Sequence, residues 1–80
     1  MRALVQRVSE SSVTIGGVVS GKIGKGINIL LGIRSGDAMK DVEYLAGKIL
    51  RLRIFPDHND KMNLSVQDVN GDILIISQFT

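Results

Sequence analysis

Hydrophobic and polar residues alternate along the first third of the chain in the pattern typical of β-strands. Residues 4–8 have this alternation, and two β-rich runs within residues 13–19 are joined by Gly16-Gly17. Glycine takes the positive φ that a tight hairpin turn requires, so these runs predict a hairpin. Residues 27–33 are apolar at both odd and even positions, which predicts a strand covered on both faces.

The spacing of apolar residues changes after Gly36. Asp37 is a suitable helix N-cap, and apolar residues follow at intervals of three and four from Val42 to Leu52. This pattern predicts one amphipathic helix of about four turns that lies on a sheet. Residues 65–68 then resemble a short capped turn, and Asn70-Gly71 resembles a tight turn.

The last run of the chain, residues 72–76, is expected to be a second strand that is buried on both faces. Several strands, one helix and two more strands predict an α+β fold, with a curled, mainly antiparallel, barrel-like sheet and the amphipathic helix packed on it. No repeat, low-complexity tract or linker interrupts the sequence. We therefore treat residues 1–80 as a single domain.

Composition narrows the classes of protein. The chain has 80 residues and no cysteine, which excludes disulfide scaffolds, thiolate zinc sites and cysteine nucleophiles. For so short a chain, the gain from apolar burial and the conformational cost of folding are of similar size, so we expect a partner subunit or more chain. No apolar run is long enough to span a membrane and the N-terminus lacks a secretory signal, so the expected location is the cytoplasm.

Few residues offer catalytic or ligand-binding chemistry. The single histidine, His58, lies in a polar turn and is expected to be a solvated loop residue. We expect no metal and no cofactor, since no metal-binding motif is present and the glycines between strands do not form a phosphate-binding loop. The net charge of +2 is compatible with a polyanionic ligand but is far below that of a dedicated nucleic-acid-binding protein.

The end of the chain is the strongest candidate site. Ser77-Gln78-Phe79-Thr80 follows the apolar run and places two hydroxyls, an amide and a ring where a central strand is expected to leave its sheet. Functional sites gather at such strand ends. The alternative is a strand that simply ends in polar residues.

Several colinear segments resemble the D-aminoacyl-tRNA deacylase family, also called D-tyrosyl-tRNA deacylases. They are residues 1–8, Ser12-Val13-Thr14, Arg51-Leu52-Arg53-Ile54-Phe55, residues 61–65 with Asp68-Val69, and above all Ser77-Gln78-Phe79-Thr80. The last of these resembles one of the family's two signatures. The resemblance covers the whole chain.

The resemblance implies hydrolysis of the ester that joins a D-amino acid, or mischarged glycine, to the 3′ end of tRNA. It also implies a homodimer with active sites at the subunit interface. By similarity, Ser77, Gln78, Phe79 and Thr80 are the catalytic residues that line the aminoacyl pocket, and Arg7 supports that pocket from the first strand. Two mechanisms are open: Thr80 acts as the nucleophile, or backbone N–H groups near Phe79 and Thr80 stabilise the oxyanion while water attacks with help from the ribose 2′-hydroxyl. We favour the second, because nothing in the sequence would lower the pKa of the threonine hydroxyl.

Family members are about twice as long, and their second signature, a Gly-cis-Pro loop that rejects L-amino acids, lies in the C-terminal half. The chain is thus expected to be the N-terminal half of such an enzyme, with little activity alone. Two alternatives are a non-catalytic remnant that acts as a dimerising or RNA-contacting module, and a piece that pairs with other chains through residues 73–79. Contacts to tRNA phosphates would come from exposed cations, with these candidates: Lys22, Lys25, Arg34, Lys40, Lys48 and Arg51.

Overall fold

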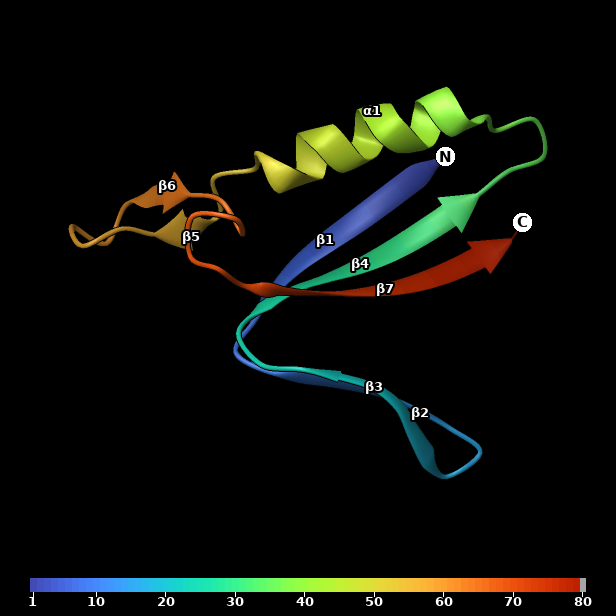
Figure 1. Cartoon of the computed structure of the whole chain (residues 1–80), viewed down its shortest axis with the longest axis horizontal. Coiled ribbons are helices and arrows are strands. Elements are labelled where there is room, and N and C mark those ends of the chain that lie inside the picture. Colours follow the sequence, from blue (N-terminus) through green and yellow to red (C-terminus); the bar gives the residue numbers. More distant parts are fainter. Residues whose placement is uncertain (80) are drawn as a thin grey trace.

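The computed structural model describes residues 1–79, and its centre is a three-stranded sheet with one helix on one face (Figure 1). The elements in chain order are β1 (Arg2–Val8), β2 (Ser11–Ile15), β3 (Val18–Ile23), β4 (Gly26–Ile33), α1 (Met39–Leu50), β5 (Phe55–Pro56), β6 (Met62–Leu64) and β7 (Asp72–Phe79). The sheet order is β1-β4-β7, with β4 antiparallel to β1 and parallel to β7. The pairs β2–β3 and β5–β6 are both antiparallel. The prediction of an α+β fold with mainly antiparallel pairing and one helix is confirmed.

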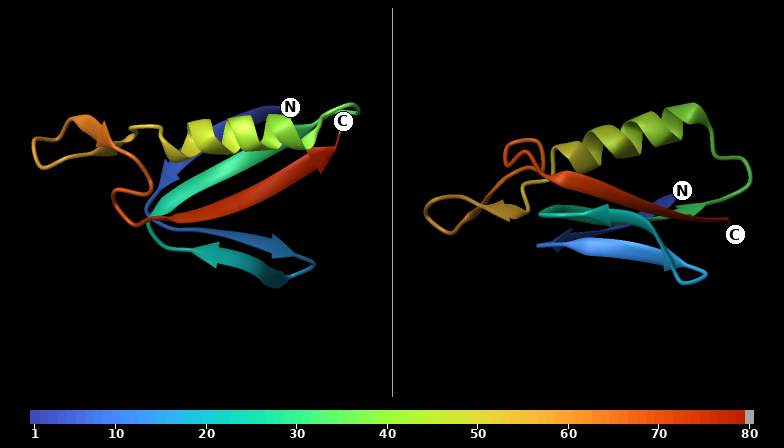
Figure 2. Two further views of the ribbon diagram at one scale, coloured as in Figure 1. Left: turned by 45° about the horizontal axis from the view of Figure 1, so that its top comes forward. Right: turned by 60° about the horizontal axis from the view of Figure 1, so that its bottom comes forward.

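The hairpin predicted around Gly16-Gly17 is also confirmed. It consists of β2 and β3, and both glycines have positive φ, 56° and 81°. The hairpin extends from the face of the sheet opposite α1 (Figure 2). It touches β7 there, since a Cβ added at Gly21 would lie 3.0 Å from the Leu74 side chain.

The hydrophobic core lies between α1, β4 and the segment after the helix. Among the described residues, the buried apolar side chains are Ile27, Ile29, Ile49, Phe55 and Val66. The prediction that β4 is covered on both faces holds only for the face that bears Ile27 and Ile29, because Leu30 on the other face is 37% exposed.

The last strand departs further from its prediction. Ile73 and Ile75 of β7 are 38% and 58% exposed, so the expected burial on both faces is wrong. The reason is topological: within residues 1–79, β7 is an edge strand that pairs only with β4. The described sheet is therefore open along β7.

The helix begins one residue later than predicted, and its N-cap is Ala38 and not Asp37. The carboxylate of Asp41 accepts the Ala38 backbone N–H at 2.8 Å, which satisfies one group at this helix end. Asp37 is engaged elsewhere, as described below. The helix ends at Leu50, so Leu52 lies outside it.

The turns before β7 match their predictions. The backbone N–H of Ser65 donates to the Asp68 carboxylate at 2.8 Å, and the N–H of Asp68 donates to Ser65 Oγ at 3.2 Å, a reciprocal cap. Asn70 has a positive φ of 55°, which makes the tight turn. At the start of the β4–β7 ladder, the Cα of Gly26 lies so close to the Asp72 backbone that a Cβ there would overlap it.

The molecule is thin and open. Its extents are 42 × 34 × 15 Å and its Cα radius of gyration is 13.8 Å. A compact domain of this length has a radius of gyration of about 12 Å. The shape agrees with the small number of buried side chains.

Candidate functional site

The polar end of β7 is still part of the sheet. Ser77, Gln78 and Phe79 pair in register with Leu31, Gly32 and Ile33 of β4. The expectation that a central strand leaves its sheet at Ser77 is therefore wrong, since the strand is at the edge and continues to Phe79. The predictions for the Phe79 side chain and for Thr80 lie outside the described residues.

Side chains alternate along a strand, so Ser77 and Gln78 point to opposite faces of the sheet. Ser77 shares its face with Ile75, which lines the side of the sheet that faces α1. Gln78 lines a hollow of about 230 Å³ on the other face, beside Leu4 and Leu30. Both Ser77 and Gln78 are exposed. Within this chain, the structure does not bring these two predicted site residues into one pocket.

Arg7 lies near the opposite end of the sheet. Its guanidinium donates to the backbone carbonyl of Ile54 at 2.9 Å and contacts Met62 Sδ at 3.2 Å. Arg7 of β1 pairs with Ile27 of β4, and Ile27 pairs with Ile73 of β7. Ser77 lies four residues after Ile73 along β7. With a rise of about 3.3 Å per residue and about 4.8 Å between neighbouring strands, the Cα atoms of Arg7 and Ser77 are about 16 Å apart. Arg7 therefore links β1 to the β5–β6 segment in this chain.

Arg7 also borders a hollow of about 280 Å³ that has a second cation on its rim. The other lining residues include Lys25 and Phe55, and Lys25 Nζ lies 5.9 Å from the centre of the Phe55 ring. A lysine ammonium at this distance over a ring gains modestly from the ring's charge distribution. All six cations proposed to contact tRNA phosphates are exposed.

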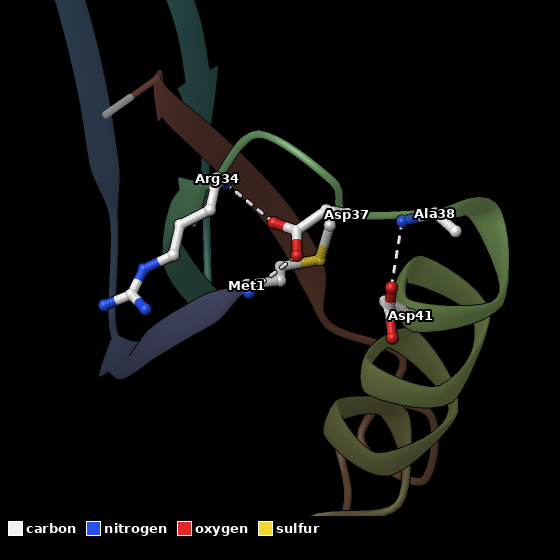
Figure 3. Close-up of polar contacts among 5 residues, drawn as sticks. All are labelled: Met1, Arg34, Asp37, Ala38 and Asp41. Carbon is white, nitrogen blue, oxygen red and sulfur yellow. Dashed lines mark hydrogen bonds and ion pairs between the residues drawn. The ribbon is translucent and has the colours of Figure 1, made fainter.

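A polar cluster joins the N-terminus to the loop before α1 (Figure 3). The N-terminal ammonium of Met1 lies 3.0 Å from Asp37 Oδ1, and the backbone N–H of Arg34 donates to Asp37 Oδ2 at 2.7 Å. These contacts lower the pKa of the Asp37 carboxyl from its ordinary value, first through the Arg34 N–H and then through the ammonium. Sequence reasoning assigned Asp37 to the helix cap and missed this contact, because the position of the N-terminus depends on the sheet register.

The described part of the chain has few of the side chains that commonly act in catalysis or bind metal ions. The only histidine, His58, lies exposed in the turn between β5 and β6. No group of three or more His, Asp or Glu side chains within residues 1–79 is placed to hold a metal ion. In the same part of the chain, no helix is both long and apolar enough to cross a lipid bilayer.

The most distinctive hollow was missed by sequence reasoning. It is an apolar groove of about 220 Å³ between α1 and the sheet, with these lining residues: Met1, Ile29, Leu31, Val42, Leu45, Ala46, Ile49, Leu50, Ile73 and Ile75. The sequence contains the apolar positions that form this groove. They are the helix stripe that begins at Val42, and Ile73 and Ile75 at alternate positions of β7. The pattern predicts that these residues are buried, but it does not show that a hollow remains between the helix and the sheet.

Comparison with known proteins identifies the class of molecule. The sequence profile described as D-Tyr-tRNA(Tyr) deacylase matches residues 4–80. Proteins named D-aminoacyl-tRNA deacylase from Clostridium acetobutylicum and Syntrophobacter fumaroxidans are 60% and 58% identical over all 80 residues. A solved structure named c-Myc DNA Unwinding Element Binding Protein superposes on the whole chain with a TM-score of 0.93 at 48% identity.

The chain belongs to the D-Tyr-tRNA(Tyr) deacylase family. It spans only about half the length of the proteins it matches, namely 54% of each of the two bacterial relatives and 54% of the solved structure. The recognition from the strand-end motif and the colinear segments is thus confirmed.

Proposed function

We propose that this chain is the N-terminal half of a D-aminoacyl-tRNA deacylase. The complete enzyme hydrolyses the ester between a D-amino acid, or mischarged glycine, and the 3′ end of tRNA, and so keeps these residues out of translation. The observation that carries the proposal is the 60% identity, over every residue of the chain, to a protein of that name. Its expected location is the cytoplasm, where aminoacyl-tRNA is used.

The proposed enzyme is a homodimer with its active sites at the subunit interface. The separation of Arg7, Ser77 and Gln78 within one chain supports this arrangement, because a pocket that uses all three needs surfaces from elsewhere. The proposed pocket is lined by Ser77, Gln78, Phe79 and Thr80 and supported by Arg7. No cofactor or metal is part of the proposal.

The proposed chemistry uses the backbone. An aminoacyl ester is already activated, so precise placement and oxyanion stabilisation supply much of the catalysis. Backbone N–H groups near Phe79 and Thr80 stabilise the oxyanion, and water attacks with help from the ribose 2′-hydroxyl. The competing mechanism, with Thr80 as nucleophile, needs a neighbouring base to activate the hydroxyl.

The test uses two proteins: the 80-residue chain, and a full-length chimera in which residues 1–80 are joined to the remaining part of the C. acetobutylicum relative. Each is incubated with D-Tyr-tRNA and with L-Tyr-tRNA, and released tyrosine is measured. We expect selective release of D-Tyr by the chimera and little release by the 80-residue chain, which lacks the half that carries the chirality filter. A folded chimera without D-Tyr release would contradict the proposed function.

A Thr80→Ala variant of the chimera separates the two mechanisms. Under the water mechanism it keeps its D-Tyr-tRNA turnover within about tenfold, whereas loss of a nucleophile costs on the order of 10⁴-fold or more. Thr14→Ala, which removes an exposed threonine hydroxyl from the hairpin, is the matched control. Complete loss of turnover by Thr80→Ala with tRNA binding intact would refute the water mechanism.

A second candidate is a non-catalytic module that dimerises or contacts RNA. The observation in its favour is that Ser77 and Gln78 face opposite sides of the sheet, so this chain does not bring them into one pocket. Release of neither amino acid by the chimera, together with retained tRNA binding, would favour this candidate.

A further inference from the structure

The outward face of α1 carries a row of positive charges. The inward face packs toward the sheet, where Val42, Leu45 and Ile49 line the groove. With 3.6 residues per turn, the opposite face holds five positions within a sector of about 100°. They are Lys40, Tyr44, Gly47, Lys48 and Arg51, and we call this set the basic ridge. All of its side chains are exposed.

The charges of the basic ridge are not neutralised by the chain itself. Within residues 1–79, no carboxylate forms an ion pair with any of its three cations. Lys48 Nζ lies 5.5 Å from the centre of the Tyr44 ring. A Cβ added at Gly47 would lie 3.4 Å from a guanidinium nitrogen of Arg51, so this side chain turns back along the helix. The two charges therefore gather on the same part of the outward face.

The stability of the helix does not account for the whole row. Lys48 and Arg51 lie in and just after the last turn, where cations complement the negative end of the helix dipole. Lys40 is the second residue of α1, at the positive end, where a cation is unfavourable. The nearby carboxylate of Asp41 is directed to the Ala38 backbone N–H. Departures from such local rules are expected at functional sites.

The basic ridge starts at the end of the molecule that bears the candidate site. Ile33, the last residue of β4, pairs with Phe79, and residues 34–38 connect β4 to α1. The start of α1 and the end of β7 accordingly lie at the same end of the molecule (Figures 1 and 2). Lys48 is about 12 Å further along the helix axis than Lys40. The row thus leads away from the strand end, on the face of the sheet that Ser77 shares.

We propose that the basic ridge binds the sugar-phosphate backbone of tRNA while the 3′ end of the same molecule occupies the aminoacyl pocket. This contact presupposes the proposed function, in which tRNA is the substrate. Lysine and arginine contacts to phosphates supply affinity without reading the sequence. Among the six candidate cations, the contact is assigned to Lys40, Lys48 and Arg51. Lys22, by contrast, lies on the hairpin, which extends from the other face of the sheet (Figure 2).

Two further properties of α1 favour RNA as the partner. Lysine and arginine are almost never fully buried, so the rest of the relatives' fold is not expected to cover the basic ridge. A helix that lies on a membrane inserts its apolar face into the lipid. In α1 that face is directed at the sheet, through Leu45 and Ile49. An anionic membrane surface is therefore the less suitable partner.

The first test measures the affinity of the full-length chimera for uncharged tRNA at several salt concentrations. Lys40→Gln and Lys48→Gln should each weaken binding about fivefold at about 0.1 M salt, and each should lower the slope of log affinity against log salt by about 0.8. Lys61→Gln is the matched control, since it removes the same charge from an exposed lysine between β5 and β6, and it should change neither quantity. Far-UV circular dichroism establishes that each variant is folded.

Two results of this test would overturn the proposal. One is an effect of Lys40→Gln and Lys48→Gln no larger than that of Lys61→Gln. The other is binding of the chimera to phosphatidylserine vesicles that Lys48→Gln abolishes while tRNA affinity is unchanged, which would assign the surface to a membrane.

The second test separates the basic ridge from the aminoacyl pocket. It compares D-Tyr-tRNA with D-Tyr esterified to the 3′-hydroxyl of adenosine, which lacks the body of the tRNA. The Lys40→Gln/Lys48→Gln variant of the chimera should have a lower kcat/KM for D-Tyr-tRNA, by about 10-fold or more, and an unchanged kcat/KM for the short ester. Equal losses on both substrates would overturn the proposal. A chimera that hydrolyses neither substrate would contradict the proposed function, whereas binding of uncharged tRNA would still decide the role of the basic ridge.

Discussion

Strands β4 and β7 lie side by side with similar sequences, yet their isoleucines have opposite environments. Ile27 and Ile29 of β4 are 1% and 6% exposed, whereas their ladder partners Ile73 and Ile75 are 38% and 58% exposed. All four lie on the face toward α1. The difference arises beyond the strand: within residues 1–79, β4 has a neighbouring strand on each side, and β7 has one on one side.

The comparison separates a covered region from an open region. The covered region is centred on β4 and includes Ile49, Phe55 and Val66. The open region consists of β7 and the groove, and it contains the proposed site residues Ser77 and Gln78. Stability should therefore depend on the first region, and binding and catalysis on the second.

The largest effect is expected where the two strands first meet. Gly26→Ala places a methyl group on the backbone of Asp72, and backbone atoms cannot rotate away. We expect a loss of about 3 kcal/mol in the free energy of unfolding, the upper part of the usual range for overpacking. The control is Gly32→Ala in the same strand, where the nearest atom, the Arg2 carbonyl oxygen, would lie 3.6 Å from the new Cβ. Urea unfolding measures both, and equal losses would contradict the close approach.

The paired isoleucines give the direct test of the comparison. Ile29→Ala should cost about 2 kcal/mol, the lower end for a buried isoleucine because the adjoining groove lets the site relax. Ile75→Ala should cost less than about 0.5 kcal/mol, as is usual for exposed positions. Equal losses in urea unfolding of the 80-residue chain would mean that the open region is closed in solution.

Two serines extend the contrast to polar groups. Ser65 is 8% exposed and its Oγ accepts the Asp68 backbone N–H, so Ser65→Ala should cost about 1 kcal/mol, as for other capping residues. Ser77 is exposed, and Ser77→Ala should leave the free energy of unfolding nearly unchanged. A large loss of stability with Ser77→Ala would contradict the assignment of β7 to the open region.

Local pattern was sufficient for most of the secondary structure. Gly16-Gly17 identified the hairpin because only a tight turn with positive φ needs two glycines there. The stripe from Val42 to Ile49 identified α1. The burial of β7 could not be predicted from its sequence. Apolar residues at both odd and even positions show that both faces of a strand are suited to burial, but they do not show whether other parts of the chain cover those faces.

The candidate site shows the same limit. The motif Ser77-Gln78-Phe79-Thr80 identified the family, and the whole-chain comparison confirmed it. The motif did not reveal that Ser77 and Gln78 face opposite sides of an edge strand, since that depends on the ladder with β4. Nor did it place Arg7 against Ile54, a contact between residues 47 positions apart.

The smallest effect is expected from the ion pair at the N-terminal end of the groove. The folded pKa of Asp37 lies below its ordinary value of 3.8, so its contribution to stability is present above about pH 3.8 and is lost as the pH falls through the lower, folded pKa. Met1 lines the groove and its ammonium contacts Asp37, so this contribution also fixes one end of the open region (Figure 3).

Asp37→Asn should therefore lower the melting temperature slightly at pH 7 and have progressively less effect below pH 3.8. The control, Asp60→Asn, makes the same charge change in the exposed β5–β6 turn. Thermal unfolding between pH 2 and pH 7, followed by circular dichroism, measures the difference between the two variants. If that difference stays constant as the pH falls through this range, the carboxylate of Asp37 does not hold the N-terminus, and Met1 is positioned by its apolar contacts with the groove alone.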